Sequence, residues 1–230
     1  MTGAVLLVAA VIAPALTAAP GRVVLDGAAK GEVRVATPRG VAVVDVALAP
    51  YALDLRGRPR LGGTPRAPRW VTARPTRLRV GPKGAVVTLA ASPPRGASPG
   101  DRPFALVLTT HAPGGSNVAV RLRIGVLVIA HVPGRIVRRL VIGPLRPGRD
   151  RTLRLTIRNT GNVVERLPRG ALILAVLRRS RVVARLRPPP RDLLPHSRAL
   201  VVARLPRSLH AAATVRVSFG SFVHRFVLRL

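Results

Sequence analysis

Cysteine is absent from the 230-residue sequence, which excludes a disulfide framework, a thiolate metal site and a cysteine nucleophile. Aromatic residues make up only 3% of the chain, so a hydrophobic core has to be built from Val, Leu, Ile and Ala. Acidic residues are also scarce, since eight stand against 39 basic residues, of which only Lys30 and Lys83 are lysine. The chain is therefore arginine-rich, with an aliphatic core and few carboxylates for catalysis.

The formal net charge of +31 has two explanations. A field of this strength attracts polyanions, so the partner would be an anionic wall polymer, an acidic lipid, a polysaccharide or nucleic acid. The other explanation is codon usage, because much Ala, Arg, Gly, Pro and Val beside little Lys, Asn, Tyr, Phe and Met is typical of a GC-rich genome. Composition alone leaves both open.

The apolar run Ala4–Leu16 is shorter than the roughly 20 residues that a membrane-spanning helix needs. The small residues Thr17 and Ala19 follow it, so residues 1–19 predict a signal peptide cleaved after Ala19. No basic residue precedes the run, and a buried strand or an uncleaved anchor are the alternatives. We expect an extracytoplasmic protein, secreted or cell-surface associated, with no transmembrane helix in the mature chain.

After residue 20 the sequence favours strands over helices. Prolines interrupt nearly every possible helix, and apolar residues alternate with polar ones. Strand-like runs recur about every 8 to 12 residues with turn signals between them, which is typical of β-sandwiches. Among them are residues 32–37, 41–48, 77–80, 85–92, 104–110, 118–128, 135–143, 153–159, 171–177, 181–187, 200–206 and 215–219.

Two segments, beginning at Val80 and Leu193, share one order of features: a proline turn, a strand that ends at proline, a loop of small residues and an alternating strand. This repetition predicts domain 1 over residues 20–132 and domain 2 over residues 133–230, joined at "HVPGR". The expected fold class is all-β, with two tandem immunoglobulin-like β-sandwich domains after the signal peptide. Domain 2 is strongly basic, with Asp150, Glu165 and Asp192 as its acids.

The stretch "RWVTARPTRLRVGPKGAVVTLAASPPRGASPGDRPFALVLTT" resembles the second half of bacterial immunoglobulin-like domains, and "PGRDRTLRLTIRNTGNV" resembles a strand and turn of the same superfamily. The long strand "VAVRLRIGVLVIAHVPG" leads into a second domain. This arrangement is similar to the WxL-interacting cell-surface family and, more distantly, to the periplasmic pilus chaperones. The first resemblance implies a surface protein that binds WxL proteins and peptidoglycan. The second implies an assembly factor, from which we transfer no residues.

The strand Val118–Val128 is a candidate edge for strand addition, in which a partner's extended segment pairs with the main chain. Its alternating aliphatic residues are Val118, Val120, Leu122 and Ile124. The simpler expectation is that the strand is fully paired inside domain 1, because edge strands are usually blunted.

Arginines on strand faces are candidates for a polyanion-binding surface, since a guanidinium holds phosphate or carboxylate with two hydrogen bonds. The alternative is a solvated outer face, as antiparallel sheets commonly have. The possible polyanion-binding residues are Arg154, Arg158, Arg178, Arg179, Arg181, Arg185, Arg187 and Arg191.

The segment "RGRPR", Arg56–Arg60, matches the core of the AT-hook, which places arginines in the DNA minor groove. A basic loop between two strands explains it equally simply, and predicted export argues against nucleic acid.

No catalytic constellation emerges from the sequence. The five histidines lack metal-ligand spacing, and neither a nucleophile elbow nor a phosphate-binding loop is present. We expect no enzyme activity, no cofactor, no metal and no small-molecule substrate. The sequence favours a non-catalytic adhesion or scaffold protein of the cell envelope that binds a surface protein or an anionic wall polymer. The alternative is a chaperone-like assembly factor for surface fibres that acts by strand addition.

Overall fold

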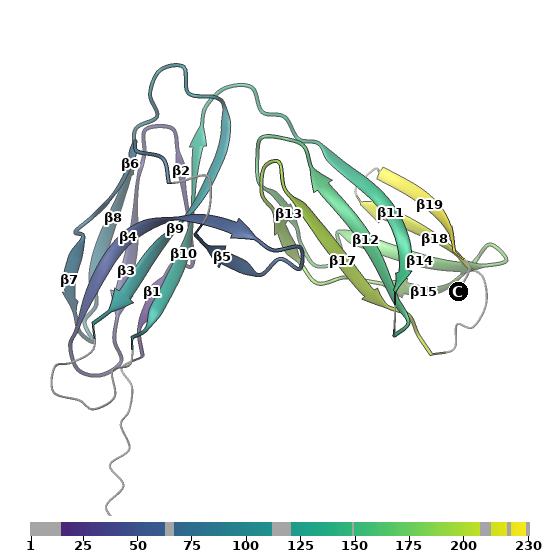
Figure 1. Ribbon diagram of the computed structural model, residues 1–230, viewed down its shortest axis with the longest axis horizontal. Coiled ribbons are helices and arrows are strands. Elements are labelled where there is room, and N and C mark those ends of the chain that lie inside the picture. The colour runs from purple at the N-terminus through teal and green to yellow at the C-terminus, as the bar shows by residue number, and fades with distance from the viewer. Residues whose placement is uncertain are drawn as a thin grey trace, which may run out of the picture.

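The computed structural model describes residues 15–62, 67–111, 121–148, 150–207, 213–219 and 222–228. All regular secondary structure in these ranges is β-strand, arranged as two sandwiches that lie at an angle and meet at one end (Figure 1). None of the described residues forms a helix long and apolar enough to cross a membrane. The predicted all-β class with two sandwich domains is confirmed.

Domain 1 consists of two packed sheets. The first contains, in spatial order, β1 (Thr17–Ala19), β3 (Lys30–Ala36), β8 (Ala85–Ala91) and β6 (Val71–Arg74). The second contains β2 (Arg22–Asp26), β10 (Arg123–Val132), β9 (Gly100–Thr110), β4 (Ala42–Leu53) and β5 (Pro59–Leu61), and β7 (Arg77–Val80) also pairs with β4. The chain crosses from the first sheet to the second between β1 and β2, so its N-terminal strands belong to different sheets.

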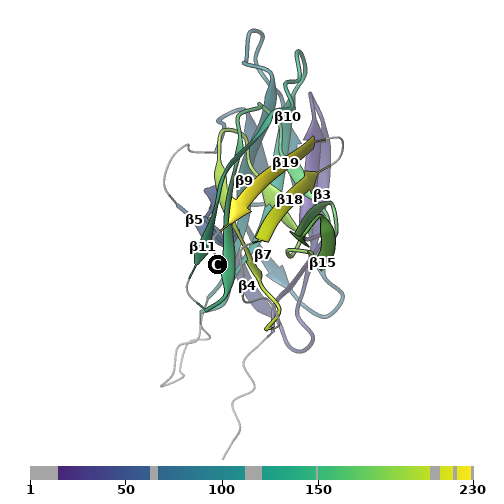
Figure 2. The ribbon, with the colours of Figure 1, turned by 90° about the vertical axis from the view of Figure 1, so that its right-hand side faces the viewer.

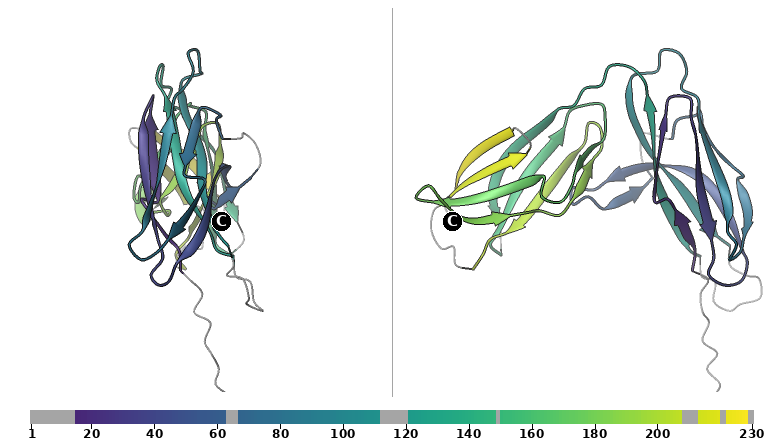
Figure 3. Two further views of the ribbon diagram at one scale, coloured as in Figure 1. Left: turned by 90° about the vertical axis from the view of Figure 1, so that its left-hand side faces the viewer. Right: turned by 180° about the vertical axis from the view of Figure 1, so that it is seen from behind.

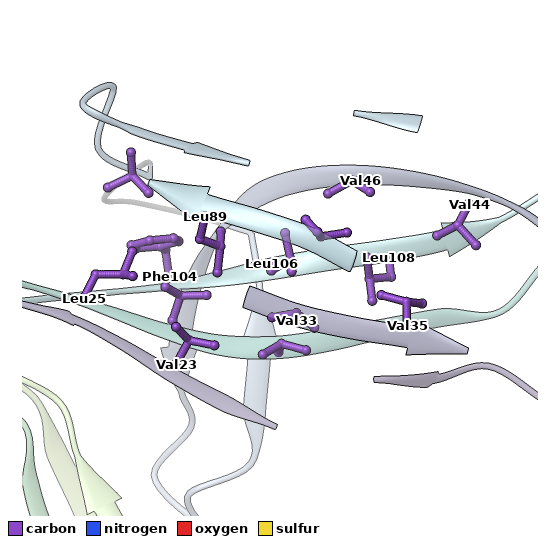
Figure 4. Close-up of a cluster of buried hydrophobic side chains, with 14 of the residues drawn as sticks. Val23, Leu25, Val33, Val35, Val44, Val46, Leu89, Phe104, Leu106 and Leu108 are labelled. Atoms are coloured by element: carbon purple, nitrogen blue, oxygen red, sulfur yellow. The ribbon is translucent and has the colours of Figure 1, made fainter. Parts of the chain in front are cut away.

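The core of domain 1 is aliphatic, as the scarcity of aromatic residues predicts. Alternate residues of β3 and β4 point inward and meet side chains from β8 and β9 (Figure 4). Phe104 is the only aromatic side chain among the largest fully buried residues of the described chain. Leu16, the last residue of the apolar run in the predicted signal peptide, is also buried in this core, and Thr17 to Ala19 pair with β3. Residues 1–14 lie outside the described residues.

Domain 2 is also a sandwich of two sheets. One sheet contains β11 (Leu140–Gly148), β12 (Thr152–Asn159) and β17 (Arg198–Arg204). The facing sheet contains β15 (Arg181–Leu186), β14 (Leu172–Arg178), β18 (Ala213–Phe219) and β19 (Phe222–Leu228), and this sheet lies toward the viewer in Figure 2. The short strands β13 (Glu165–Leu167) and β16 (Arg191–Leu193) form a separate pair. Leu153, Leu155 and Ile157 of β12 point into the core, as their alternation predicts.

The strand expected over residues 135–143 begins only at Leu140. The reason is the turn that follows β12. The N–H of Val137 donates to Oδ1 of Asn162 at 2.7 Å, and the Val137 carbonyl accepts the Asn162 N–H at 3.0 Å. Both backbone groups of Val137 are therefore bonded to this turn and cannot join a sheet ladder.

The same turn fastens the two domains together. The side-chain amide of Asn162 donates to the carbonyls of Pro99 at 3.0 Å and Arg135 at 2.9 Å. The Asp101 N–H donates to the Asn162 carbonyl at 2.8 Å, and Oδ2 of Asp101 accepts the Val164 N–H at 2.7 Å. The turn "NTGN" is thus the main polar link between domain 1 and domain 2.

A small apolar cluster supports these hydrogen bonds. Ile129 of domain 1 packs with Val164 and Leu194 of domain 2, flanked by the half-buried Tyr51, Leu53 and Leu127. Burial raises the pKa of Tyr51, which lies at this junction. An ion pair, Arg22 to Asp192 at 2.9 Å, also joins the two domains.

Candidate functional site

The first half of β10 is an open sheet edge in the described part of the chain. On one side β10 pairs with β9 along its whole length, from Arg123 to Val132. On the other side it pairs with β2 only from Leu127 to His131. Within the predicted strand Val118–Val128, Leu127 and Val128 are paired on both sides, whereas residues 123–126 are paired with β9 alone.

The edge is open because of where the chain changes sheets. Residues 17–19 form β1 in the opposite sheet, and the chain reaches β10 only after Pro20, where the Leu127 N–H donates to the Gly21 carbonyl at 3.2 Å. No described strand covers residues 123–126 on this side.

The hydrogen-bond pattern shows which backbone groups face the open side. Leu122 faces β9, because its carbonyl accepts the Thr110 N–H and its N–H donates to the Thr110 hydroxyl, both at 2.9 Å. In an antiparallel ladder the next residue points its backbone groups the opposite way. The N–H and C=O groups of Arg123 and Gly125 therefore face outward, like those of Leu127.

The predicted edge residues are only partly described. Leu122 and Ile124 are half-buried and pack against the domain 1 core, whereas the alternating residues Arg123 and Gly125 are exposed. Val118 and Val120 lie outside the described residues. The aliphatic face of the edge is thus continuous with the core, and its polar backbone groups point to solvent.

The segment Arg56–Arg60 contains the turn at the tip of the β4–β5 hairpin and the first two residues of β5. The carboxylate of Asp54 accepts the N–H groups of Arg56 at 2.8 Å and Arg58 at 2.9 Å, together with Nε of Arg58 at 2.8 Å. The neighbouring Leu55 carbonyl accepts the N–H of Leu200, on β17, at 2.6 Å. The hairpin therefore reaches across to domain 2 (Figure 3), and "RGRPR" lies where the chain turns from β4 into β5.

Acid is expected to loosen this turn. The hydrogen bond from the Arg58 N–H, helped by the Arg58 guanidinium and the Arg56 N–H against partial burial, lowers the pKa of Asp54 to about 2. Because the folded-state pKa is lowered, the ionised carboxylate stabilises the turn above pH 4, and this contribution is lost as the pH falls from about 4 towards 2. The amide proton shifts of Arg56 and Arg58 in an NMR titration should change with a midpoint near 2. The same shifts should be flat in Asp54→Asn, and a midpoint near 4 would contradict the assignment.

The eight arginines proposed for polyanion binding do not form one patch. Arg154 and Arg158 are exposed on the outer face of β12. Arg191 is half-buried, donates to the Leu200 carbonyl at 2.8 Å, and has its pKa lowered by burial. The others lie on or beside the β14–β15 hairpin of the facing sheet: Arg178, Arg179, Arg181, Arg185 and Arg187.

Two histidines contact carboxylates. His131 Nδ1 lies 2.7 Å from Oδ1 of Asp101, whose other carboxylate oxygen accepts the hydrogen bond from the Val164 N–H. His111 pairs with Asp45, which is also bonded to Arg77 at 2.9 Å. The His111 hydrogen bond, aided by Arg77, lowers the pKa of Asp45. Among the described residues no group of three or more metal-ligating side chains comes together.

Solved structures with a similar fold are known, but the comparisons by sequence match no family. No protein-family model matches the sequence, and no curated protein does. A structure of a chaperone–tip adhesin complex of CFA/I fimbriae matches with a TM-score of 0.55 at 9% identity, covering 93% of this chain and 98% of the other. The class 5 fimbriae chaperone CfaA matches with a TM-score of 0.53 at 11% identity, covering 94% and 100%.

A third match is a structure of the Salmonella enterica SafA pilin in complex with the SafB chaperone, with a TM-score of 0.52 at 10% identity, covering 93% of this chain and 96% of the other. These similarities give no support to the WxL-interacting family. At identities this low they establish the fold alone: both sandwiches of this chain, in tandem, are similar to the architecture found in structures of fimbrial chaperones.

Proposed function

We propose that this protein is a non-catalytic, chaperone-like protein that holds a partner protein by adding one of the partner's strands to the open edge of β10. The observation that carries the proposal is the one-sided pairing of residues 123–126, with outward backbone groups at Arg123 and Gly125. An unpaired edge of this kind is a template for main-chain hydrogen bonds.

The proposal also explains the side chains of the edge. Leu122 and Ile124 are half-buried at the rim of the domain 1 core, so an added strand would cover apolar surface as well as backbone. The similar structures also support binding of a protein partner, because two of them are described as a chaperone with a pilin or a tip adhesin.

An extracytoplasmic location is part of the proposal and rests on the apolar run Ala4–Leu16. Cleavage after Ala19 would remove β1 and the buried Leu16 from the sandwich. A mature chain that still contains residues 16–19 would keep Leu16 in the core and β1 paired with β3.

Adhesion to an anionic wall polymer is the second candidate, and the exposed arginines of domain 2 favour it. Their distribution over both sheets provides no single binding face. We therefore rank it below strand addition.

A panel of uncharged peptides with alternating valine and threonine tests the proposal. Binding measured by fluorescence anisotropy should persist when salt is raised, because the contacts are main-chain hydrogen bonds and apolar burial. Binding of none of these peptides, together with salt-sensitive binding of wall polymer, would support the adhesion role instead.

A further inference from the structure

A groove of about 860 Å³ lies between the β4–β5 hairpin and the outer face of the sheet β11-β12-β17. Its hairpin side presents Leu53, Leu55 and Arg60. Its domain 2 side presents Val141 from β11, Arg158 from β12 and Arg198 from β17. The sequence singles out Arg158 and Arg60 for separate reasons and does not bring them together, because the groove forms where segments far apart in the chain meet.

Three guanidinium groups of this groove have no carboxylate partner in the described part of the chain. Arg158 and Arg198 are direct cross-strand neighbours in the antiparallel pair β12–β17. Among the described residues neither of them, nor Arg60, forms an ion pair. The carboxylate in the lining, Asp54, is already bonded to Arg56 and Arg58. Like charges directly opposite each other destabilise a sheet, so an anion placed between them would relieve repulsion.

The walls of the groove are apolar beside these charges. Leu55 is 44% exposed and Val141 is 43% exposed, so both aliphatic side chains of the lining are open to contact by an occupant of the groove. A phosphate polymer would neutralise the arginines and leave both aliphatic side chains in water. An extended peptide with carboxylates on one side and apolar residues on the other matches both features, since its side chains alternate every residue.

The groove also lies close to the open edge of β10. A Cβ atom added to Gly125 would lie 3.8 Å from both Cδ atoms of Leu61, and Leu61 follows Arg60 on β5. Leu61 therefore lies next to the edge of β10, and the residue before it, Arg60, lines the groove. This proximity argues for a polypeptide occupant, and that one step rests on the proposed function.

We propose that this groove binds an acidic polypeptide segment in extended conformation, with Arg60, Arg158 and Arg198 holding its carboxylates and Leu55 and Val141 covering its apolar side chains. The groove is a second contact surface for a protein partner. It differs from the proposed strand-addition edge of β10, which would bind the partner's main chain whatever the charge of the partner's side chains.

The test uses a labelled peptide of alternating glutamate and leucine, titrated by fluorescence anisotropy at low salt. The double variant Arg158→Ala/Arg198→Ala should bind at least about ten-fold more weakly, because each lost hydrogen bond to a charged group is worth more than a kcal/mol. The control Arg178→Ala/Arg185→Ala removes the same charge from the facing sheet and should bind like the unmodified protein. Thermal unfolding verifies that both variants remain folded.

Two further probes identify the occupant. A peptide with serine in place of leucine should bind more weakly, and polyphosphate should compete poorly. Equal weakening by both double variants would overturn the proposal, because attraction would then be nonspecific. Tighter binding of polyphosphate through Arg158 and Arg198, or no effect of removing leucine, would also overturn it. The variant Arg123→Pro should bind the acidic peptide normally, which separates failure of the groove from failure of strand addition.

Discussion

Replacing Arg123 by proline is expected to abolish strand addition at β10 while leaving domain 1 folded. The Arg123 N–H points away from β9, so its loss removes no hydrogen bond of the native sheet. An incoming strand would meet the proline ring and lose a main-chain partner. A lost donor against a buried acceptor costs about 1–3 kcal/mol, so we expect peptide binding to weaken by about ten-fold or more.

Two control variants separate the backbone effect from other causes. Arg123→Ala removes the same side chain and keeps the N–H, and should bind like the unmodified protein. Leu122→Pro removes the N–H that donates to the Thr110 hydroxyl inside domain 1, and should lower the thermal unfolding temperature instead. Undiminished peptide binding by Arg123→Pro would show that the partner does not pair with this edge.

Gly100→Ala is expected to open the junction between the domains. Gly100 has φ of +117°, and a Cβ atom there would overlap the carbonyl oxygen of Asn162. An L-residue in a left-handed conformation costs about 1–2 kcal/mol. Losing the hydrogen bond from the adjacent Asp101 N–H to Asn162 adds about 1 kcal/mol. We expect a total loss of about 2–3 kcal/mol in urea unfolding and a larger radius of gyration by small-angle X-ray scattering.

Arg22→Ala provides the contrast at the same junction. It removes the ion pair with Asp192, whose two side chains are each about one quarter exposed. Partly exposed pairs contribute at most about 1 kcal/mol, so the radius of gyration should not change. An opening of the junction by Arg22→Ala but not by Gly100→Ala would mean that the ion pair, rather than the turn at Asn162, holds the domains.

The features that the sequence predicts correctly depend on neighbours along the chain. Leu153, Leu155 and Ile157 point inward and Arg154 and Arg158 outward, because side chains on a strand alternate. Turn residues between such runs were sufficient to predict a sandwich fold. Short strands such as β5, β13 and β16 have too few residues to show alternation, and the sequence did not reveal them.

The candidate sites depend on contacts between distant segments, which periodicity does not contain. Leu122 and Ile124 could be named from their alternation, but the open side of β10 follows from where residues 17–22 cross between sheets. The apolar run Ala4–Leu16 is compatible with a signal segment and with a buried strand, and its composition does not distinguish the two. Arg198 reaches Arg158 only through the register of β12 and β17.

The measurement that tests the central claim most directly is amide hydrogen exchange at Arg123 and Gly125, followed by NMR with and without a strand-forming peptide. In the free protein these N–H groups face solvent and should exchange fast, whereas the N–H of Ile124 faces β9 and should exchange slowly. Saturation with the peptide should protect Arg123 and Gly125 to the level of Ile124. Saturation that leaves both amides exchanging fast would contradict strand addition at this edge.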